Sequence, residues 1–362
     1  MLYRPTIART VIYGVSRRGL ITSVRLRAPL TAAPVTERRA PGLQPPDSTH
    51  FKDSPTPIHE HQSNKILGDW VLFHPVYTKE ENEAVEVLHR PPTSISDRVA
   101  DLFTKVTRWG FDFVSKYEHK EIPPNHKMSL AELRAGGYTM SERQWLARIL
   151  FLESIAGVPG MVAAACRHLR SLRLMKRDAG WIHTLLQEAE NERMHLMTFM
   201  TLKKPSRFFR ASVLAAQGVY YNAFFLAYLI SPRTAHRFVG YLEEEAVFTY
   251  SRIIKEIEDG HLPEWENLPA PAIAIEYWRL PADAKLLDVM YAVRSDESTH
   301  RFVNHSLASL ETGDTNPFAL GEPGMKLKGT KIGFERDESA RYVRQKGEQT
   351  QHVMEEKQKK EK

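Results

Sequence analysis

Cysteine is almost absent from this chain, which contains a single one, Cys166, among 362 residues. One thiol cannot build an intramolecular disulfide framework, and it cannot supply a multi-cysteine zinc site. Cys166 lies in an apolar run of helical character, residues 161–168. We therefore expect a buried structural thiol at this position.

Acidic residues are scarce at the N-terminus, where residues 1–40 hold eight Arg, no Lys and one acid, Glu37. An Arg-rich, acid-poor amphipathic start is typical of a mitochondrial transit peptide, with a generic basic arm as the alternative. Residues 41–62 are rich in Pro and polar residues, which predicts a flexible arm. The net charge of +6 comes without any zinc, helix-turn-helix or aromatic RNA-binding pattern, so nucleic acid is not expected as a partner.

Alternating β-type patterns are nearly missing between residues 97 and 310. Proline punctuation and helical periodicity instead predict long helices. Their expected ranges are 97–117, 140–175, 179–202, 208–230, 236–259 and 283–310. The pattern predicts one all-α domain over residues 63–335. Residues 336–362, dominated by Lys, Glu, Gln and Arg, are predicted to form a charged tail that is solvated or disordered.

Two apolar stretches raise the question of a membrane. Residues 211–230 carry no charge and are long enough to span a bilayer, but they contain several polar side chains. Residues 146–166 include Glu153, which would be costly to carry across lipid. We predict a monotopic arrangement with one apolar face in a leaflet, spanning being the alternative. A basic cluster is then expected near anionic headgroups: Arg167, Arg170, Arg173, Lys176 and Arg177.

Two Glu-x-x-His quartets are the most informative motif: Glu192 with His195, and Glu297 with His300. Positions i and i+3 of a helix share a face, so each quartet presents a carboxylate and an imidazole to the same point. Two other matches, at residues 86–89 and 258–261, lie beside Pro or Gly and are predicted to be solvated helix ends.

Two lone glutamate positions complete a ligand pattern. Glu153 has apolar neighbours, and an unpaired buried carboxylate there would be expensive. In the run Glu243 to Glu245, helical rotation allows one or two side chains to face inward. A lone Glu, then Glu-x-x-His, then the same order again is the ligand set of a carboxylate-bridged di-iron centre in a four-helix bundle. Carboxylate-rich ligation favours iron or manganese, and iron suits a redox enzyme that works on dioxygen.

Three further side chains lie beside these ligands in the sequence. Tyr250 follows Glu243 by two helical turns, so it shares that face and is either a redox relay or a core tyrosine. Asn191 and Asp296 directly precede the two quartet glutamates and are candidates for orienting the ligands.

At these residues the chain resembles the mitochondrial alternative oxidase family, in its fungal and protist type. Four motifs carry the resemblance in order, which covers roughly residues 63–330: Leu152-Glu153-Ser154, Asn191-Glu192-Arg193-Met194-His195-Leu196, Leu242-Glu243-Glu244-Glu245-Ala246 and Arg294-Ser295-Asp296-Glu297-Ser298-Thr299-His300. Plant members use an N-terminal cysteine for disulfide control of the dimer. No cysteine precedes Cys166 here, so that regulation is expected to be absent.

The resemblance implies cyanide-insensitive oxidation of ubiquinol coupled to reduction of dioxygen to water, without proton pumping. It implies a ferritin-like four-helix bundle with two additional long helices and two carboxylate-bridged, non-haem iron ions. It also implies a homodimer, bound monotopically to the matrix side of the mitochondrial inner membrane. A hydroxylase or desaturase that acts on a quinone precursor or lipid would share the same ligands and is the alternative function.

Residue roles are carried over from the same resemblance. The implied iron ligands are Glu153, Glu192, His195, Glu243, Glu297 and His300. Tyr250 matches the family's redox-active tyrosine, and Tyr228 matches another tyrosine of less certain role. The network around the ligands is implied to contain Asn191, His236, Tyr277, Trp278 and Asp296. The quinol pocket is implied to contain Arg108, Asp112, Arg148, Leu152, Glu245, Ala246 and Thr249.

Overall fold

The structure, a computed structural model, describes residues 75–360 except 116, 119, 124–126 and 312. The predicted transit peptide and the arm over residues 41–62 lie outside the described residues. Within the described part the regular elements are helices, and the only β-type pairing is an isolated bridge between Pro269 and Lys285. The all-α prediction is confirmed.

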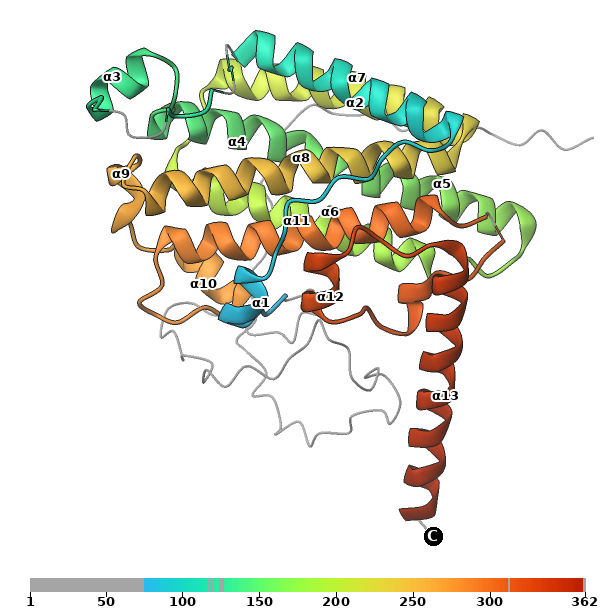
Figure 1. Cartoon of the computed structure of the whole chain (residues 1–362). Coiled ribbons are helices and arrows are strands. Elements are labelled where there is room, and N and C mark those ends of the chain that lie inside the picture. The colour runs from blue at the N-terminus through green and yellow to red at the C-terminus, as the bar shows by residue number, and fades with distance from the viewer. Residues whose placement is uncertain (1–74, 116, 119, 124–126, 312, 361–362) are drawn as a thin grey trace, which may run out of the picture. The chain divides into compact units, whose positions relative to one another are not determined.

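The helices follow one another with short connections (Figure 1). The first six are α1 (Lys79–Glu83), α2 (Ile95–Ser115), α3 (Leu130–Ala135), α4 (Glu142–Ala156), α5 (Val158–Leu174) and α6 (Trp181–Leu202). The next are α7 (Arg207–Ile230), α8 (Pro232–Glu258), α9 (Pro263–Glu266), α10 (Ala272–Trp278) and α11 (Leu286–Ala308). The 3-10 turn η1 (Pro317–Leu320), α12 (Met325–Thr330) and α13 (Arg336–Lys360) follow.

Local chemistry sets the boundary between α7 and α8. Ser231 follows the last residue of α7, and its hydroxyl accepts the backbone N–H of Thr234 at 3.2 Å. Pro232, at the first position of α8, lacks an N–H that would have no helical partner in any case. The two helices can therefore turn sharply while their end groups stay satisfied.

The single helix predicted over residues 140–175 is in fact two, α4 and α5, which meet at Gly157. Glycines also let α5 approach α6 closely. A Cβ placed on Gly160 would lie 2.6 Å from the carbonyl oxygen of Leu185, and one on Gly157 would lie 3.2 Å from that of Ala189. The break itself has a local cause, because Pro159 in the first turn of α5 has no N–H to continue α4 and its ring would clash with the preceding turn.

Helices α4, α6, α8 and α11 form the central bundle, with α8 and α11 running side by side (Figure 1). One apolar core fills its α3 end and includes Trp145, Ile149, Tyr250, Val289 and Met290. Helix α2 packs on α8, and α7 packs on α4, α5 and α8. These two are the additional long helices that the resemblance implied.

The outer faces of α2 and α7 are apolar and exposed. Of the 24 residues of α7, only Phe224 and Tyr228 are buried. Helix α2 exposes large side chains along its outer face, among them Leu102, Phe103 and Trp109. Two helical stretches are long and apolar enough to cross a membrane, Glu142–Leu174 and Arg207–Ile230, but half of the first is buried inside the protein against 11% of the second. An extensive apolar surface therefore runs over α7.

Two sequence predictions are wrong or incomplete. Arg167 does not belong to the basic cluster expected near anionic headgroups, because it is buried, donates to Asp178 at 2.9 Å and lies 4.0 Å over the ring of Trp181. The charged tail is helical as α13, at least to Lys360. Lys, Glu, Gln and Arg are strong helix formers. Arg336 anchors the start of this helix by an ion pair with Asp314 at 2.8 Å.

Candidate metal centre

Four helices bring six buried side chains to one point in the bundle. Helix α4 supplies Glu153, α6 supplies Glu192 and His195, α8 supplies Glu243, and α11 supplies Glu297 and His300. They form two overlapping groups that could each hold a metal ion, with ligand atoms within 4.8 Å of one another. Glu192 and Glu297 belong to both groups. Two shared carboxylates are what a bridged pair of cations requires.

Both imidazoles direct the same ring atom at the shared carboxylates. The Nδ1 atom of His195 lies 3.5 Å from Glu192 and 3.4 Å from Glu297. The Nδ1 atom of His300 lies 2.7 Å from Glu192 and 3.5 Å from Glu297. Glu153 is a further 3.4 Å neighbour of His195 Nδ1. The i,i+3 spacing of each quartet thus places its pair on one inward face, as the sequence predicted.

The ligand atoms lack partners that would compensate for their burial. Both carboxylate oxygens of Glu192, one oxygen of Glu153, and Nδ1 of His195 and of His300 are buried without a hydrogen bond of normal geometry. Buried polar atoms left in this state are costly. A cation in each of the two groups would satisfy these atoms, and four carboxylates with two imidazoles suit iron or manganese. The residues present therefore fit a metal centre.

The electrostatics of the carboxylates also favours a bound cation. Burial raises the pKa of Glu153 to about 8, with the charges of Glu192 and Glu297 adding to the shift. Burial and the nearby Glu297 also raise the pKa of Glu243 well above its ordinary value. Without a cation the site disfavours several carboxylate charges at once, because they repel one another in a dry environment. Positive charge is what would allow all of them to ionise.

Asp296 holds His195 from the side opposite the ligands. Its Oδ2 atom lies 2.9 Å from His195 Nε2 and accepts hydrogen bonds from Asn191 at 2.9 Å and from the Trp278 indole at 2.8 Å. The Asn191 amide also donates to the Tyr277 hydroxyl at 2.9 Å. A proton kept on Nε2 leaves the Nδ1 lone pair directed at the cluster. The structure thus joins four of the five residues implied for the network.

The fifth residue, His236, lies in a separate hydrogen-bonded chain. Tyr228 and His236 are linked at 3.2 Å, and His236 Nδ1 lies 3.1 Å from the Asn304 side-chain oxygen. The Asn304 amide donates to Glu188 at 2.7 Å and to the backbone carbonyl of His300 at 3.1 Å. Burial lowers the pKa of His236 to about 4, so its imidazole is neutral. The chain connects Tyr228 to the helix turn that carries a candidate ligand.

Sequence reasoning missed Tyr77, Glu188 and Asn304. Glu188 lies one turn before Glu192 on the same face of α6, so helical spacing could have found it. Burial raises the pKa of Glu188 to about 7. Tyr77 donates from its hydroxyl to Asp296, 219 residues later in the chain. No local pattern signals a contact between residues so far apart.

Tyr250 lies directly against a candidate ligand. Its hydroxyl donates a hydrogen bond to the carboxylate of Glu153. Burial, then the charges of Glu153 and Glu297, raise the pKa of Tyr250 well above its ordinary value. The phenol therefore keeps its proton next to the cluster.

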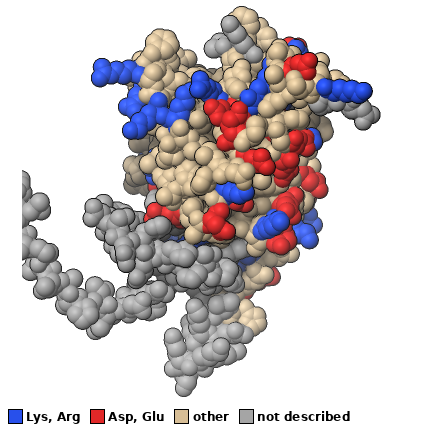
Figure 2. All heavy atoms as spheres, turned by 90° about the vertical axis from the view of Figure 1, so that its left-hand side faces the viewer, with Lys and Arg blue, Asp and Glu red and all other residues tan. Residues whose placement is uncertain are grey.

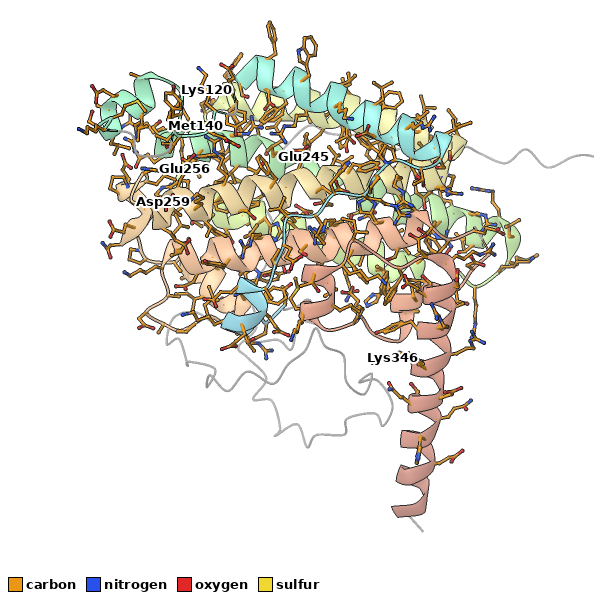
Figure 3. All side chains as sticks on the ribbon, viewed as in Figure 1. Lys120, Met140, Glu245, Glu256, Asp259 and Lys346 are labelled. Atoms are coloured by element: carbon orange, nitrogen blue, oxygen red, sulfur yellow. The ribbon has the colours of Figure 1, made fainter. Side chains whose placement is uncertain are left out.

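The three consecutive glutamates of α8 have different surroundings, which agrees with the prediction that helical rotation lets only one or two of them face inward. Glu243 joins the cluster. Glu244 is buried and lies 2.6 Å from His89 Nδ1 and 2.8 Å from His305 Nε2. Glu245, labelled on α8 in Figure 3, forms an ion pair with Arg108 of α2. Only one of the three is available as a ligand.

Most of the residues implied for a quinol pocket meet where α2, α4 and α8 adjoin. Arg148 donates to Asp112 at 2.6 Å, and Arg108 donates to the other oxygen of Asp112 at 3.2 Å. Arg108 also pairs with Glu245. The remaining three, Leu152, Ala246 and Thr249, are half-buried on α4 and α8. Since Leu152 precedes Glu153, this polar group adjoins the cluster through α4.

The part of the chain that contains the six candidate ligands also matches a known protein family. A family model described as alternative oxidase matches residues 77–309. The mitochondrial alternative oxidase of Cryptococcus neoformans is 49% identical over 356 residues, covering 95% of this chain and 89% of the relative. That of Emericella nidulans is 52% identical over 275 residues, covering 73% and 75%. That of Botryotinia fuckeliana is 47% identical over 331 residues, covering 87% and 91%.

Proposed function

This chain belongs to the alternative oxidase family, and on that premise we propose that it oxidises ubiquinol and reduces dioxygen to water at a di-iron centre. Two quinols supply four electrons and four protons, and one dioxygen takes them up to give two waters. The observation that carries the proposal is the pair of overlapping ligand groups, which share Glu192 and Glu297. The reaction pumps no protons in this proposal, and cyanide, which poisons haem oxidases, leaves it active.

Six side chains would hold the metal: Glu153, Glu192, His195, Glu243, Glu297 and His300. Two iron ions bound there would supply the redox capacity that dioxygen reduction needs. Asp296 fixes His195 so that Nδ1 faces the shared carboxylates. Burial of the cluster keeps bulk water away from the reacting oxygen. Tyr250 holds a proton on its phenolic oxygen beside Glu153 and is placed to give that proton and one electron.

The quinol would bind where α2, α4 and α8 adjoin. Asp112 and Glu245 offer carboxylate oxygens that accept hydrogen bonds from the quinol hydroxyls, and Arg148 offers donors to the quinone oxygens formed from them. The buried Nε atom of Arg148 has no hydrogen-bond partner in the described structure. An oxygen of the substrate would satisfy it, which favours a headgroup site here.

Oxygen uptake by the purified, iron-loaded protein tests the function. With ubiquinol as the donor and cyanide present, we expect uptake to continue, and Glu297→Ala to abolish it and lower the iron content. Uptake that stops in cyanide would refute the oxidase. A hydroxylase or desaturase, which the comparisons do not favour, would instead yield an oxygenated or dehydrogenated lipid. Product analysis by mass spectrometry separates the two activities.

We also propose that the protein is mitochondrial and lies monotopically on the matrix side of the inner membrane. The relatives are named as mitochondrial proteins. The exposed apolar surface of α7 supports one-leaflet insertion, and the exposed Lys203, Lys204 and Arg207 at its start suit anionic headgroups. Figure 2, a view onto the α3 end, shows Lys and Arg gathered at the upper left, and Asp and Glu running down the right-hand side with further Lys and Arg among them. Protease protection of mitochondria and of mitoplasts tests the topology.

The assembly proposed is a homodimer. Exposed apolar side chains on α5, namely Met161, Leu169 and Leu172, continue the apolar surface next to α7, which packs on α5. A second copy would cover such a surface. Light scattering of the detergent-solubilised protein, corrected for bound detergent, measures the protein mass. A mass of one chain would contradict the dimer.

A further inference from the structure

Arg148 is clamped between two aromatic rings. Its guanidinium carbon lies 4.4 Å from the ring centroid of Phe111 and 4.3 Å from that of Tyr117. In the plane of the guanidinium it donates to Asp112 at 2.6 Å and to the hydroxyl of Ser115 at 3.0 Å. The side chain is only 5% exposed, and Nε has no hydrogen-bond partner. One donor is therefore held in a set direction with nothing to bind.

Tyr117, one of the two rings, is itself fixed by the bundle. Arg252 on α8 donates to its hydroxyl at 2.7 Å. The same guanidinium donates through Nε to Glu256 at 2.9 Å, and Glu256 also accepts from the Trp145 indole at 2.9 Å. Figure 3 shows Glu256 on α8 toward the α3 end of the bundle. Because Glu256 and Trp145 are buried, this anchor is rigid.

We propose that Tyr117 is a positioning residue of the quinol site, which holds Arg148 for the headgroup of the substrate. The proposal rests on the function proposed above and adds a residue to it. Tyr117 lies after the end of α2, and Arg252 lies two residues after Tyr250 on α8. The contact between them therefore ties Tyr117 to the helix that carries Tyr250.

The proposed role of Tyr117 affects the binding of the quinol and not its oxidation. A guanidinium between two rings is restrained to one plane, so its free N–H points one way before the quinol arrives. Loss of one ring lets the guanidinium tilt, and part of the binding free energy is then used to order it again. The ligands, Asp296 and Tyr250 are untouched by this change. Quinol affinity should fall while turnover at saturation stays near that of the wild type.

The test compares Tyr117→Leu, Tyr117→Phe and Tyr291→Leu. Tyr291 is the matched control, because its ring also lies against an arginine, Arg294 at 4.9 Å, and its hydroxyl also bonds to a charged partner, Glu258 at 2.6 Å. It lies on α11 among residues that take no part in the proposed quinol site. KM and kcat are measured with a short-chain ubiquinol, and the Kd of the matching short-chain ubiquinone is measured by calorimetry. Iron content and Tm are recorded for every variant.

We expect Tyr117→Leu to raise KM and Kd about five- to tenfold, with kcat within about twofold. This is less than the roughly thirtyfold effect of losing a desolvated cation–π contact outright, because the ring of Phe111 still restrains the guanidinium. Tyr117→Phe keeps the ring but loses the Arg252 anchor, so a smaller rise of both constants is expected. Tyr291→Leu should leave both at the wild-type values. Unchanged KM and Kd in Tyr117→Leu, or a loss confined to kcat, would overturn the proposal.

Two further outcomes are also decisive. If Tyr117→Leu loses iron or stability, the KM and Kd of Tyr117→Phe are the test instead. Wild-type values of both constants in Tyr117→Phe would then overturn the proposal. If the wild type oxidises no ubiquinol, the proposed function fails. The Kd for ubiquinone still measures the role of Tyr117 in that case, so the two failures are distinguishable.

Discussion

Asp296 and His195 lie 101 residues apart in the chain, yet Oδ2 of the first is 2.9 Å from Nε2 of the second. The contact crosses from α11 to α6 and sets which ring nitrogen of His195 carries the proton. Asp296 directly precedes the quartet of Glu297 and His300, and His195 belongs to the other quartet. One helix of the bundle therefore orients a metal-binding side chain of the other, and the two quartets act as a unit.

Asp296→Asn tests that relationship. The neutral amide lacks the negative charge that holds the proton on Nε2 of His195. Iron affinity should therefore fall about 10- to 100-fold, the usual effect of losing such a partner. Competition with a chelator, followed by iron analysis, measures the affinity. Asp283→Asn, at an exposed site between α10 and α11, is the control. Equal iron retention by both variants would contradict the role of Asp296.

Tyr250→Phe separates redox chemistry from folding. Removal of the hydroxyl that donates to Glu153 should lower quinol-dependent oxygen uptake about a hundredfold or more while the iron content stays the same. Tyr241→Phe is a close control, because Tyr241 is buried on the same helix and its hydroxyl has no hydrogen-bond partner among the described residues. Full activity in Tyr250→Phe would leave Tyr250 as a core residue only.

Glu188 predicts a pH dependence of the metal-free protein. Its pKa is raised from 4.5 to about 7 on folding. Between these values the folded chain binds more protons than the unfolded chain, so the free energy of unfolding falls as pH rises. Glu188→Gln should remove part of that fall across this window. Urea denaturation of the chelated protein at several pH values measures it, and an identical slope in the variant would rule out this contribution.

Gly160→Ala should destabilise the protein by about 1–3 kcal/mol, because a Cβ there would lie 2.6 Å from the Leu185 carbonyl and push α5 away from α6. Gly218→Ala is the matched control in a helix. Nothing lies within 4 Å of its Cβ position, so a gain of about 0.5–1 kcal/mol is expected. Chemical denaturation gives both values. Two variants of equal stability would show that α5 can shift freely.

The positions of the long helices could be predicted from the sequence, because helical periodicity and prolines act over a few residues. The inward-facing pairs Glu192 with His195 and Glu297 with His300 follow from the same local geometry. Their assignment as ligands came from the order of four motifs and from the resemblance. Local rules also predicted that Glu243, Glu244 and Glu245 could not all face one way.

The amino-acid sequence by itself determined the helical class, the family and the set of candidate ligands, since each depends on residue types at fixed short spacing. Only the tertiary structure decided which distant groups meet. It buried Arg167 against Trp181, and brought Tyr77 to Asp296 and Tyr117 to Arg148. These contacts depend on how helices pack across the bundle, and packing is a property of the whole chain that no local spacing encodes.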